Sequence, residues 1–146
     1  MADTILVVVE QREGKLNRVS WETIGGAQAI AAETGWTLEA AVVGSGVGDI
    51  AKEVAGKKVS KVYALESAKL EPYTPDGFVA ALKPFIEQKQ PKLVLMPHTY
   101  QVRDFAPKLA AGLDRALISD AVGYKYEGGA LRFTQIGRAH VSTPVT

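Results

Sequence analysis

The sequence predicts an α/β fold with a mainly parallel sheet, helices on both faces of that sheet and a C-terminal antiparallel hairpin. Two observations lead to this prediction. Four short, strongly apolar runs are each followed by a stretch with helical spacing of apolar residues, which is the pattern of parallel strands joined by right-handed helical crossovers. Near the end of the chain, aromatic and aliphatic residues alternate with polar ones on both sides of residues 127–129, which is typical of a hairpin.

The first strand and the first helix are expected within residues 5–35. Ile5 to Val9 is a continuous apolar run, which suits a strand buried on both faces. Gln11 to Arg18 is polar and is expected to form a loop. Ser20 is a suitable N-cap for the helix that follows, and Gly35 is expected to end it. A second strand is predicted directly afterwards, from Leu38 to Val43.

A short helix, a third strand and a longer helix are predicted in the middle of the chain. Asp49 is expected to cap the short helix, and Val62 to Leu65 to form the strand. Residues 74–76, Thr-Pro-Asp, predict the start of the longer helix, because proline is favoured at the first helical position and an acid in the first turn. Pro84 lies within the apolar stripe of this helix and should kink or divide it.

The last predicted strand–helix unit precedes the hairpin. Leu93 to Met96 is the fourth buried strand, and a helix is expected from about Asp104. Pro107 would then lie in the first turn, where proline is tolerated. Tyr124 to Phe133 contains the hairpin. We therefore expect one domain over residues 1–135, with a Rossmann-like arrangement of strands and helices.

Composition excludes several classes of function. The net charge is +1, with 17 basic and 16 acidic residues interspersed, so the basic excess of a nucleic-acid-binding protein is missing. The longest apolar run, Ile5 to Val9, is far shorter than the roughly 20 residues of a membrane span, so membrane insertion is not expected. The chain has no cysteine and only two histidines, His98 and His140, and this set does not make a metal site.

A glycine-rich loop is the first candidate for ligand binding. Gly44, Gly46 and Gly48 follow a predicted strand and precede a predicted helix, and such loops can present backbone N–H groups and a helix N-terminus to a phosphate. The spacing is not that of a dinucleotide fingerprint, and the lysine and hydroxyl residue of a P-loop are missing. The alternative is a tight strand-to-helix turn that needs positive φ angles.

The loop after the fourth strand is the second candidate. His98, Thr99 and Arg103 lie just beyond that strand, and the carboxyl ends of strands in open α/β sheets are where ligands bind. His98 could act as a general base or contact a cofactor, and Arg103 could hold an anion. In the alternative, which we favour, Thr99 and Asp104 cap the next helix and Arg103 pairs with a neighbouring acid. No activated nucleophile accompanies the histidine, so no catalytic residue is predicted.

An ordered series of segments resembles the electron transfer flavoprotein α subunit, and the resemblance runs roughly from Thr4 to Phe133. No single segment is decisive, but their order is fairly specific. The segments are Ile5 to Glu10, Val42 to Gly46, Val59 to Tyr63, Pro97 to Thr99, Arg103 to Ala110 and Leu117 to Asp120.

This resemblance implies an electron carrier rather than an enzyme, with an N-terminal domain of the Rossmann-like, adenine-nucleotide-hydrolase-like type. It implies a heterodimer with the electron transfer flavoprotein β subunit, which shuttles electrons from flavin-linked dehydrogenases, such as those of fatty-acid β-oxidation, to the respiratory chain. The family holds its FAD mainly in a C-terminal domain of the α subunit, so no flavin ligand carries over to this chain, which we expect to be a truncated N-terminal fragment. The implied location is the bacterial cytoplasm, favoured, or the mitochondrial matrix.

Two other functions remain open at this stage. The first is a small nucleotide-binding module of the universal-stress type, which would use Gly44, Gly46, Gly48 and the His98 loop. The second is an enzyme that uses His98. Equilibrium titration with ATP or AMP tests the first, and replacement of His98 by alanine tests the second.

The last eleven residues, 136–146, depart from the resemblance. Their sequence looks like a translated short-read sequencing adapter joined to a truncated reading frame, and we exclude them from the fold prediction. A genuine short variant with a polar tail is the competing explanation.

Deletion of residues 136–146 should therefore leave the melting temperature of the chain unchanged within error. The reason is that a segment that did not evolve with the core is expected to lie exposed or loosely docked. Thermal unfolding of the full and shortened chains measures the difference, and a clear loss of stability would contradict the prediction.

Overall fold

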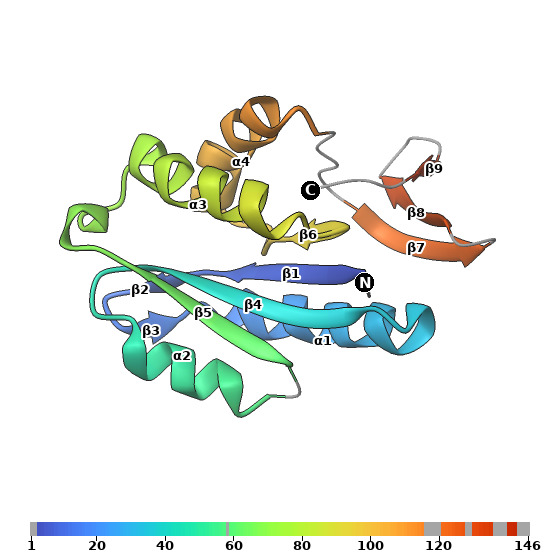
Figure 1. The fold of residues 1–146 in the computed structure, drawn as a ribbon, viewed down its shortest axis with the longest axis horizontal. Coiled ribbons are helices and arrows are strands. Elements are labelled where there is room, and N and C mark those ends of the chain that lie inside the picture. Colours follow the sequence, from blue (N-terminus) through green and yellow to red (C-terminus); the bar gives the residue numbers. More distant parts are fainter. Residues whose placement is uncertain (1–2, 58, 116–120, 128–129, 136–139, 143–146) are drawn as a thin grey trace.

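A parallel four-stranded sheet forms the centre of the molecule (Figure 1). The computed structural model describes residues 3–57, 59–115, 121–127, 130–135 and 140–142. All three strand pairings of the central sheet are parallel, in the order β5-β4-β1-β6, which confirms the predicted fold class. The strands are β1 (Thr4–Val9), β4 (Thr37–Gly44), β5 (Lys61–Glu66) and β6 (Leu93–Leu95).

Helices cover both faces of this sheet, as the sequence predicts (Figure 1). One face carries α1 (Arg18–Thr34) and α2 (Gly48–Ala55), and the other carries α3 (Pro75–Lys89) and α4 (Tyr100–Leu113). A short 3₁₀ helix, η1 (Ala68–Leu70), follows β5.

Strand β1 divides its side chains between two hydrophobic cores, because successive residues of a strand point to opposite faces. Ile5, Val7 and Val9 belong to the core that includes buried residues of α1 and α2. Leu6 and Val8 belong to the core built from α3 and α4. A run of five buried apolar residues is therefore what a strand covered on both faces requires.

Two of the predicted helix boundaries are confirmed by their caps. Thr74 accepts a hydrogen bond from the Gly77 N–H at 3.0 Å and begins α3. Gly35 ends α1 in the left-handed conformation, with φ of 77°.

Three other predicted helix starts are wrong. Helix α1 begins after Asn17 rather than Ser20, because the Asn17 side chain accepts the Val19 N–H at 2.8 Å while Ser20 is buried inside the first turn. Helix α4 begins at Tyr100, well before Asp104. Asp49 lies in the first turn of α2 and is not its cap, since the residue at the cap position is Val47.

Both prolines lie inside helices, and the prediction for Pro107 is wrong, whereas the predicted kink at Pro84 stays a prediction. Pro84 does not divide α3, and Pro107 lies in the middle of α4 rather than in its first turn. Both prolines are exposed, as are Ala80 and Arg103, the residues four positions earlier. The residues whose carbonyl groups lose a hydrogen bond thus lie on the exposed side of each helix, where water lowers the cost of an internal proline.

The polar segment after β1 contains a small hairpin where only a loop was predicted. Strands β2 (Gln11–Arg12) and β3 (Lys15–Leu16) pair antiparallel. Glu13 and Gly14 form the turn with positive φ angles of 52° and 81°, which is the conformation that two-residue hairpin turns need.

The predicted C-terminal hairpin is confirmed by the antiparallel pairing of β7 (Ala121–Glu127) with β8 (Ala130–Gln135). A third strand, β9 (His140–Ser142), pairs with β8 at the outer side of this sheet. Residues 136–139 and 143–146 of the predicted adapter-derived tail lie outside the described residues, and the assignment of the tail stays a prediction. Leu117 to Asp120, part of the family resemblance, also lie outside them.

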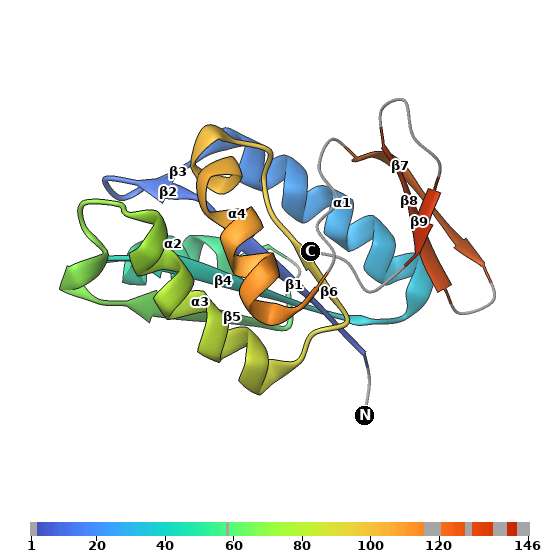
Figure 2. The ribbon, with the colours of Figure 1, turned by 90° about the horizontal axis from the view of Figure 1, so that it is seen from above.

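The hairpin is attached near the C-terminal end of α1 (Figure 2). Leu131 is fully buried in the core beside α1. The Tyr126 ring packs edge-on against Trp36, with the ring centres 6.1 Å apart.

Replacing Leu131 by alanine should lower the free energy of unfolding by roughly 2–4 kcal/mol, because it leaves a cavity where the hairpin meets the core. Urea denaturation measures the change. Lys15→Ala, at an exposed position, is the control and should stay within about 0.5 kcal/mol of the parent chain. Equal stability of the two variants would show that the hairpin does not dock in this way.

Candidate functional site

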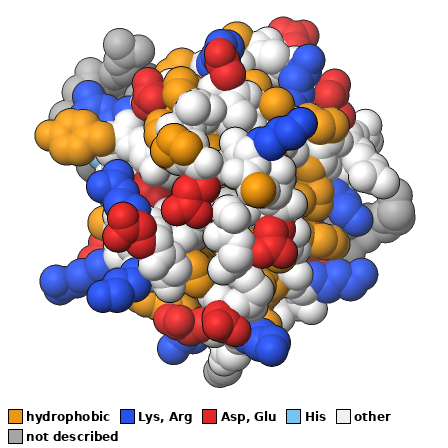
Figure 3. All heavy atoms as spheres, turned by 90° about the vertical axis from the view of Figure 1, so that its left-hand side faces the viewer, with side chains coloured by type: hydrophobic (Ala, Val, Ile, Leu, Met, Phe, Trp, Pro, Cys, Tyr) orange, Lys and Arg blue, Asp and Glu red, His pale blue; other side chains and the backbone are white. Residues whose placement is uncertain are grey.

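Both predicted ligand loops lie at the carboxyl edge of the central sheet, on opposite sides of β1. Gly44, Gly46 and Gly48 follow β4, whereas His98, Thr99 and Arg103 follow β6, and β1 pairs with both strands. In open parallel sheets this is the place where strand order reverses and where ligands bind. Figure 3 views the molecule from this edge and shows acidic and basic side chains interspersed over the surface.

The glycine loop is shaped by its own chain. Gly44 is buried with φ of 156°, and a Cβ atom there would collide with the side-chain nitrogen of Gln11. That nitrogen donates to the Val43 carbonyl at 3.4 Å. Gly46 has φ of 65°, a left-handed conformation that glycine adopts without strain. Two of the three glycines are thus required by the turn itself.

A carboxylate uses one N–H group of this loop. The Val47 N–H, at the cap position of α2, donates to Glu66 Oε1 at 3.1 Å. Glu66 is the last residue of β5. An acid from the neighbouring strand therefore takes a backbone donor of the kind that a phosphate would use in such a loop.

Thr99 contacts a second carboxylate, that of Glu10, which follows β1. The Thr99 hydroxyl donates to Glu10 Oε1 at 2.6 Å and accepts the Val102 N–H at 3.1 Å, so it caps α4 as predicted. Asn17 Nδ2 donates to Glu10 Oε2 at 2.8 Å. Glu10 is only 7% exposed, and its two oxygens each accept from the N-cap residue of a different helix.

Ser20 completes this arrangement through the backbone of Glu10. The Glu10 N–H donates to Ser20 Oγ at 2.8 Å, and the Ser20 hydroxyl lies 3.3 Å from the Glu10 carbonyl oxygen. The same carbonyl accepts the Asn17 N–H at 2.7 Å. Ser20 therefore fixes the path of the chain beyond β1 instead of capping α1.

His98, in the loop before α4, and Arg103, in the first turns of α4, are both exposed. The Arg103 guanidinium carbon is 5.9 Å from the centre of the Tyr100 ring, and Tyr100 itself is 88% exposed. The structure thus places Thr99 against the buried Glu10 carboxylate, whereas His98 and Arg103 lie at the surface.

Asp104, expected as a cap, instead contacts Tyr73. The Tyr73 hydroxyl lies 2.9 Å from Asp104 Oδ2 and 3.2 Å from the Gln101 carbonyl oxygen. Burial, and then the hydrogen bond to Asp104, raise the pKa of Tyr73 well above its usual value. This phenol remains protonated and serves as a donor that ties the segment before α3 to α4.

Glu10, Gln11 and Asn17 are residues of this edge that sequence reasoning did not single out as site residues. Its position in the sequence could have identified Glu10, because it is the first charged residue after a buried strand. Parallel sheets bind ligands at the carboxyl ends of such strands.

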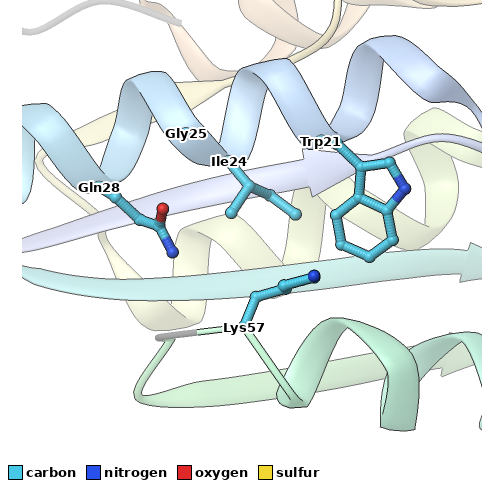
Figure 4. Close-up of a pocket in the computed structure, with 5 residues that line it drawn as sticks. All are labelled: Trp21, Ile24, Gly25, Gln28 and Lys57. Carbon is cyan, nitrogen blue, oxygen red and sulfur yellow. The ribbon is translucent and has the colours of Figure 1, made fainter.

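A shallow hollow of about 250 Å³ lies elsewhere, beside α1 (Figure 4). Trp21, Ile24, Gly25 and Gln28 line it, and the Lys57 ammonium lies 5.0 Å from the centre of the Trp21 ring. None of the predicted site residues contributes to it. Within the described ranges, no group of three or more potential metal ligands comes together, and no helix is long and apolar enough to cross a membrane.

Comparison with known proteins identifies the family. The model of the electron transfer flavoprotein domain matches residues 5–143. The chain belongs to this family. This confirms the resemblance inferred from the ordered segments, and it does not favour the universal-stress type of module.

Several curated electron transfer proteins are similar to the chain. The α subunit of Bacillus subtilis strain 168 is 35% identical over 92% of this chain and 41% of its own length. That of Syntrophomonas wolfei is 33% identical over 88% of this chain and 39% of its own. The acryloyl-CoA reductase electron transfer subunit beta of Anaerotignum propionicum is 34% identical over 80% of this chain and 32% of its own. The chain thus spans about two fifths or less of these relatives.

Gly44→Ala should lower the free energy of unfolding by about 1–3 kcal/mol, because it combines a strained backbone angle with displacement of Gln11. Gly48→Ala, at the start of α2 where a Cβ would meet nothing within 4 Å, is the matched control and should be neutral or slightly stabilising. Denaturant unfolding measures both.

A Gln11→Ala, Gly44→Ala double variant should recover part of the loss, because it removes the collision with Gln11 but keeps the strained angle and the close approach to Val47. Equal stability of the two single glycine variants would contradict this account of the loop.

Proposed function

We propose that this chain is the N-terminal α/β domain of an electron transfer flavoprotein α subunit and that it acts as a scaffold without catalysing a reaction itself. The observation that carries the proposal is the ordered similarity to α subunits, which covers 92% of this chain but 41% of the Bacillus subtilis relative. The longer protein has room for a separate flavin-binding part.

FAD is the cofactor we propose for the complete protein, held by its C-terminal domain. The family name supports a flavin. In this domain, the carboxyl edge of the sheet presents the Glu10 and Glu66 carboxylates to the helix N-termini. A pyrophosphate needs hydrogen-bond donors at such positions, so these acids support a flavin site elsewhere and no cofactor-binding residue in this fragment. In this proposal Gly44 and Gly46 form the turn after β4, and Gly48 begins α2. Thr99 caps α4, and His98 and Arg103 are exposed surface residues.

The proposed partner is the electron transfer flavoprotein β subunit. In this heterodimer the complete protein would accept electrons from flavin-linked dehydrogenases, including those of fatty-acid β-oxidation, and pass them toward the respiratory chain. One similar protein is named as the electron transfer subunit of a reductase that acts on a coenzyme A thioester, which supports an enzyme of coenzyme A thioesters as a redox partner. The bacterial relatives support a cytoplasmic rather than a mitochondrial location.

The 146-residue chain, purified in the presence of excess FAD, should be colourless and lack the absorbance bands of a flavin after gel filtration, because Glu10 and Glu66 take donors at the carboxyl edge of the sheet that a pyrophosphate would need. Absorbance after gel filtration measures this. Isothermal titration with AMP or ATP should show no micromolar binding.

The positive control is the longer α subunit, co-expressed with its β subunit, which should purify as a yellow complex. Stoichiometric FAD on the 146-residue chain would contradict the assignment of the flavin to another domain. Micromolar binding of AMP to the chain would instead favour a nucleotide-binding function.

A further inference from the structure

Glu10 is the most deeply buried acid at the carboxyl edge of the sheet, and its environment is that of a bound anion. The side chain is 7% exposed. Oε1 accepts from the Thr99 hydroxyl at 2.6 Å, and Oε2 accepts from Asn17 Nδ2 at 2.8 Å. A buried carboxylate is costly unless its oxygens are hydrogen-bonded, and here each oxygen has a donor.

Two helices begin at this carboxylate. Asn17 is the N-cap of α1, which has 17 residues, and Thr99 is the N-cap of α4, which has 14. The positive ends of both helix dipoles therefore lie beside one negative charge, which each dipole favours. The carboxylate lies between β1 and β6, where the two helices leave the sheet toward opposite faces. Parallel α/β sheets bind the phosphate groups of ligands at such positions.

We propose that Glu10 is a built-in anion that occupies this position and closes it to phosphate-bearing ligands. Removal of its carboxylate would leave a latent site for a small oxyanion, formed by the Asn17 amide, the Thr99 hydroxyl and the two helix N-termini. The inference stands independently of the proposed electron-transfer role.

The glycine loop has a similar but less buried contact between a glutamate and a helix N-terminus. Glu66, an exposed side chain, reaches the Val47 N–H at the start of α2. Each of the two loops that the sequence marks as candidates for ligand binding is thus contacted by a glutamate of the chain itself. Glu10 is the better test, because it is buried and holds two helices.

Acetate is the probe for the vacated position, because Glu10→Ala removes a methylene group and a carboxylate, which together match acetate in shape and charge. The variant should melt below the parent chain. Acetate should then raise its melting temperature in a saturable way, by about 3–5 °C at ten times the dissociation constant. Acetamide, which has nearly the same shape without the charge, and sodium chloride at equal ionic strength should not.

Glu10→Gln is the matched control, since it fills the position and leaves no room for acetate. The parent chain and this variant should show no saturable response to acetate. In Glu10→Ala, amide chemical-shift changes upon acetate addition should concentrate at residues 17–20 and 99–102. An equal response of all three proteins, or no response of a folded Glu10→Ala, would overturn the proposal.

A second measurement does not depend on the stability of the alanine variant. The parent chain should show no saturable chemical-shift change at residues 10, 17 and 99 with inorganic phosphate or AMP. Binding of either ligand at these residues with Glu10 in place would show that the carboxylate does not close the position, and would equally overturn the proposal. The flavin content of the longer protein is not involved in either test, so failure with acetate or inorganic phosphate leaves the proposed function untouched, whereas binding of AMP would count against both.

Discussion

The hydrogen bond between Thr99 and Glu10 joins parts of the chain that lie 89 positions apart, and the arrangement of the sheet's carboxyl edge depends on it. Glu10 extends from β1, Asn17 begins α1 and Thr99 begins α4. Since α1 and α4 cover opposite faces of the sheet (Figure 1), one carboxylate sets where both layers start. Removing either donor would leave a buried oxygen without a partner, and the cost of such an unsatisfied group exceeds the net gain of an ordinary hydrogen bond.

The short strand β6 is held at both ends by this kind of contact. It has three residues, and among the strands that the structure describes it pairs with β1 alone. At its carboxyl end the Thr99–Glu10 hydrogen bond fixes the turn into α4. Before the strand, the Arg115 guanidinium donates to the carbonyl groups of Pro91 and Lys92 at 2.7 and 3.1 Å. Burial lowers the pKa of Arg115, but a guanidinium remains charged far above neutral pH. The side chains of Thr99, just before α4, and Arg115, just after its C-cap, thus compensate for the small number of strand hydrogen bonds.

Local sequence predicted the elements well and their long-range contacts poorly. Consecutive apolar residues predict the buried strands. Thr74 predicts the start of α3 and Gly35 the end of α1, because these caps involve only nearby backbone groups. Ser20 was mistaken for a cap because its residue type fits, while its actual partner is the backbone of Glu10, ten positions away. The predicted start of α4 at about Asp104 is wrong, and Pro107, which that start would put in the first turn, lies mid-helix at an exposed position. Residue type alone does not separate these cases, because the deciding neighbour lies outside the local window.

For the same reason the sequence does not decide whether the glycine loop binds a ligand or only forms a turn. Backbone N–H groups at a strand-to-helix turn are available to a ligand only if no side chain reaches them first. In this domain Glu66, 19 positions beyond Val47, takes one of these donors, and the Gln11 side chain lies against the face of Gly44. Both contacts arise because β4 lies between β5 and β1 in the sheet. A glycine-rich turn therefore acquires or loses ligand binding through the residues at the ends of the neighbouring strands, and the order of strands in the sheet decides which residues those are.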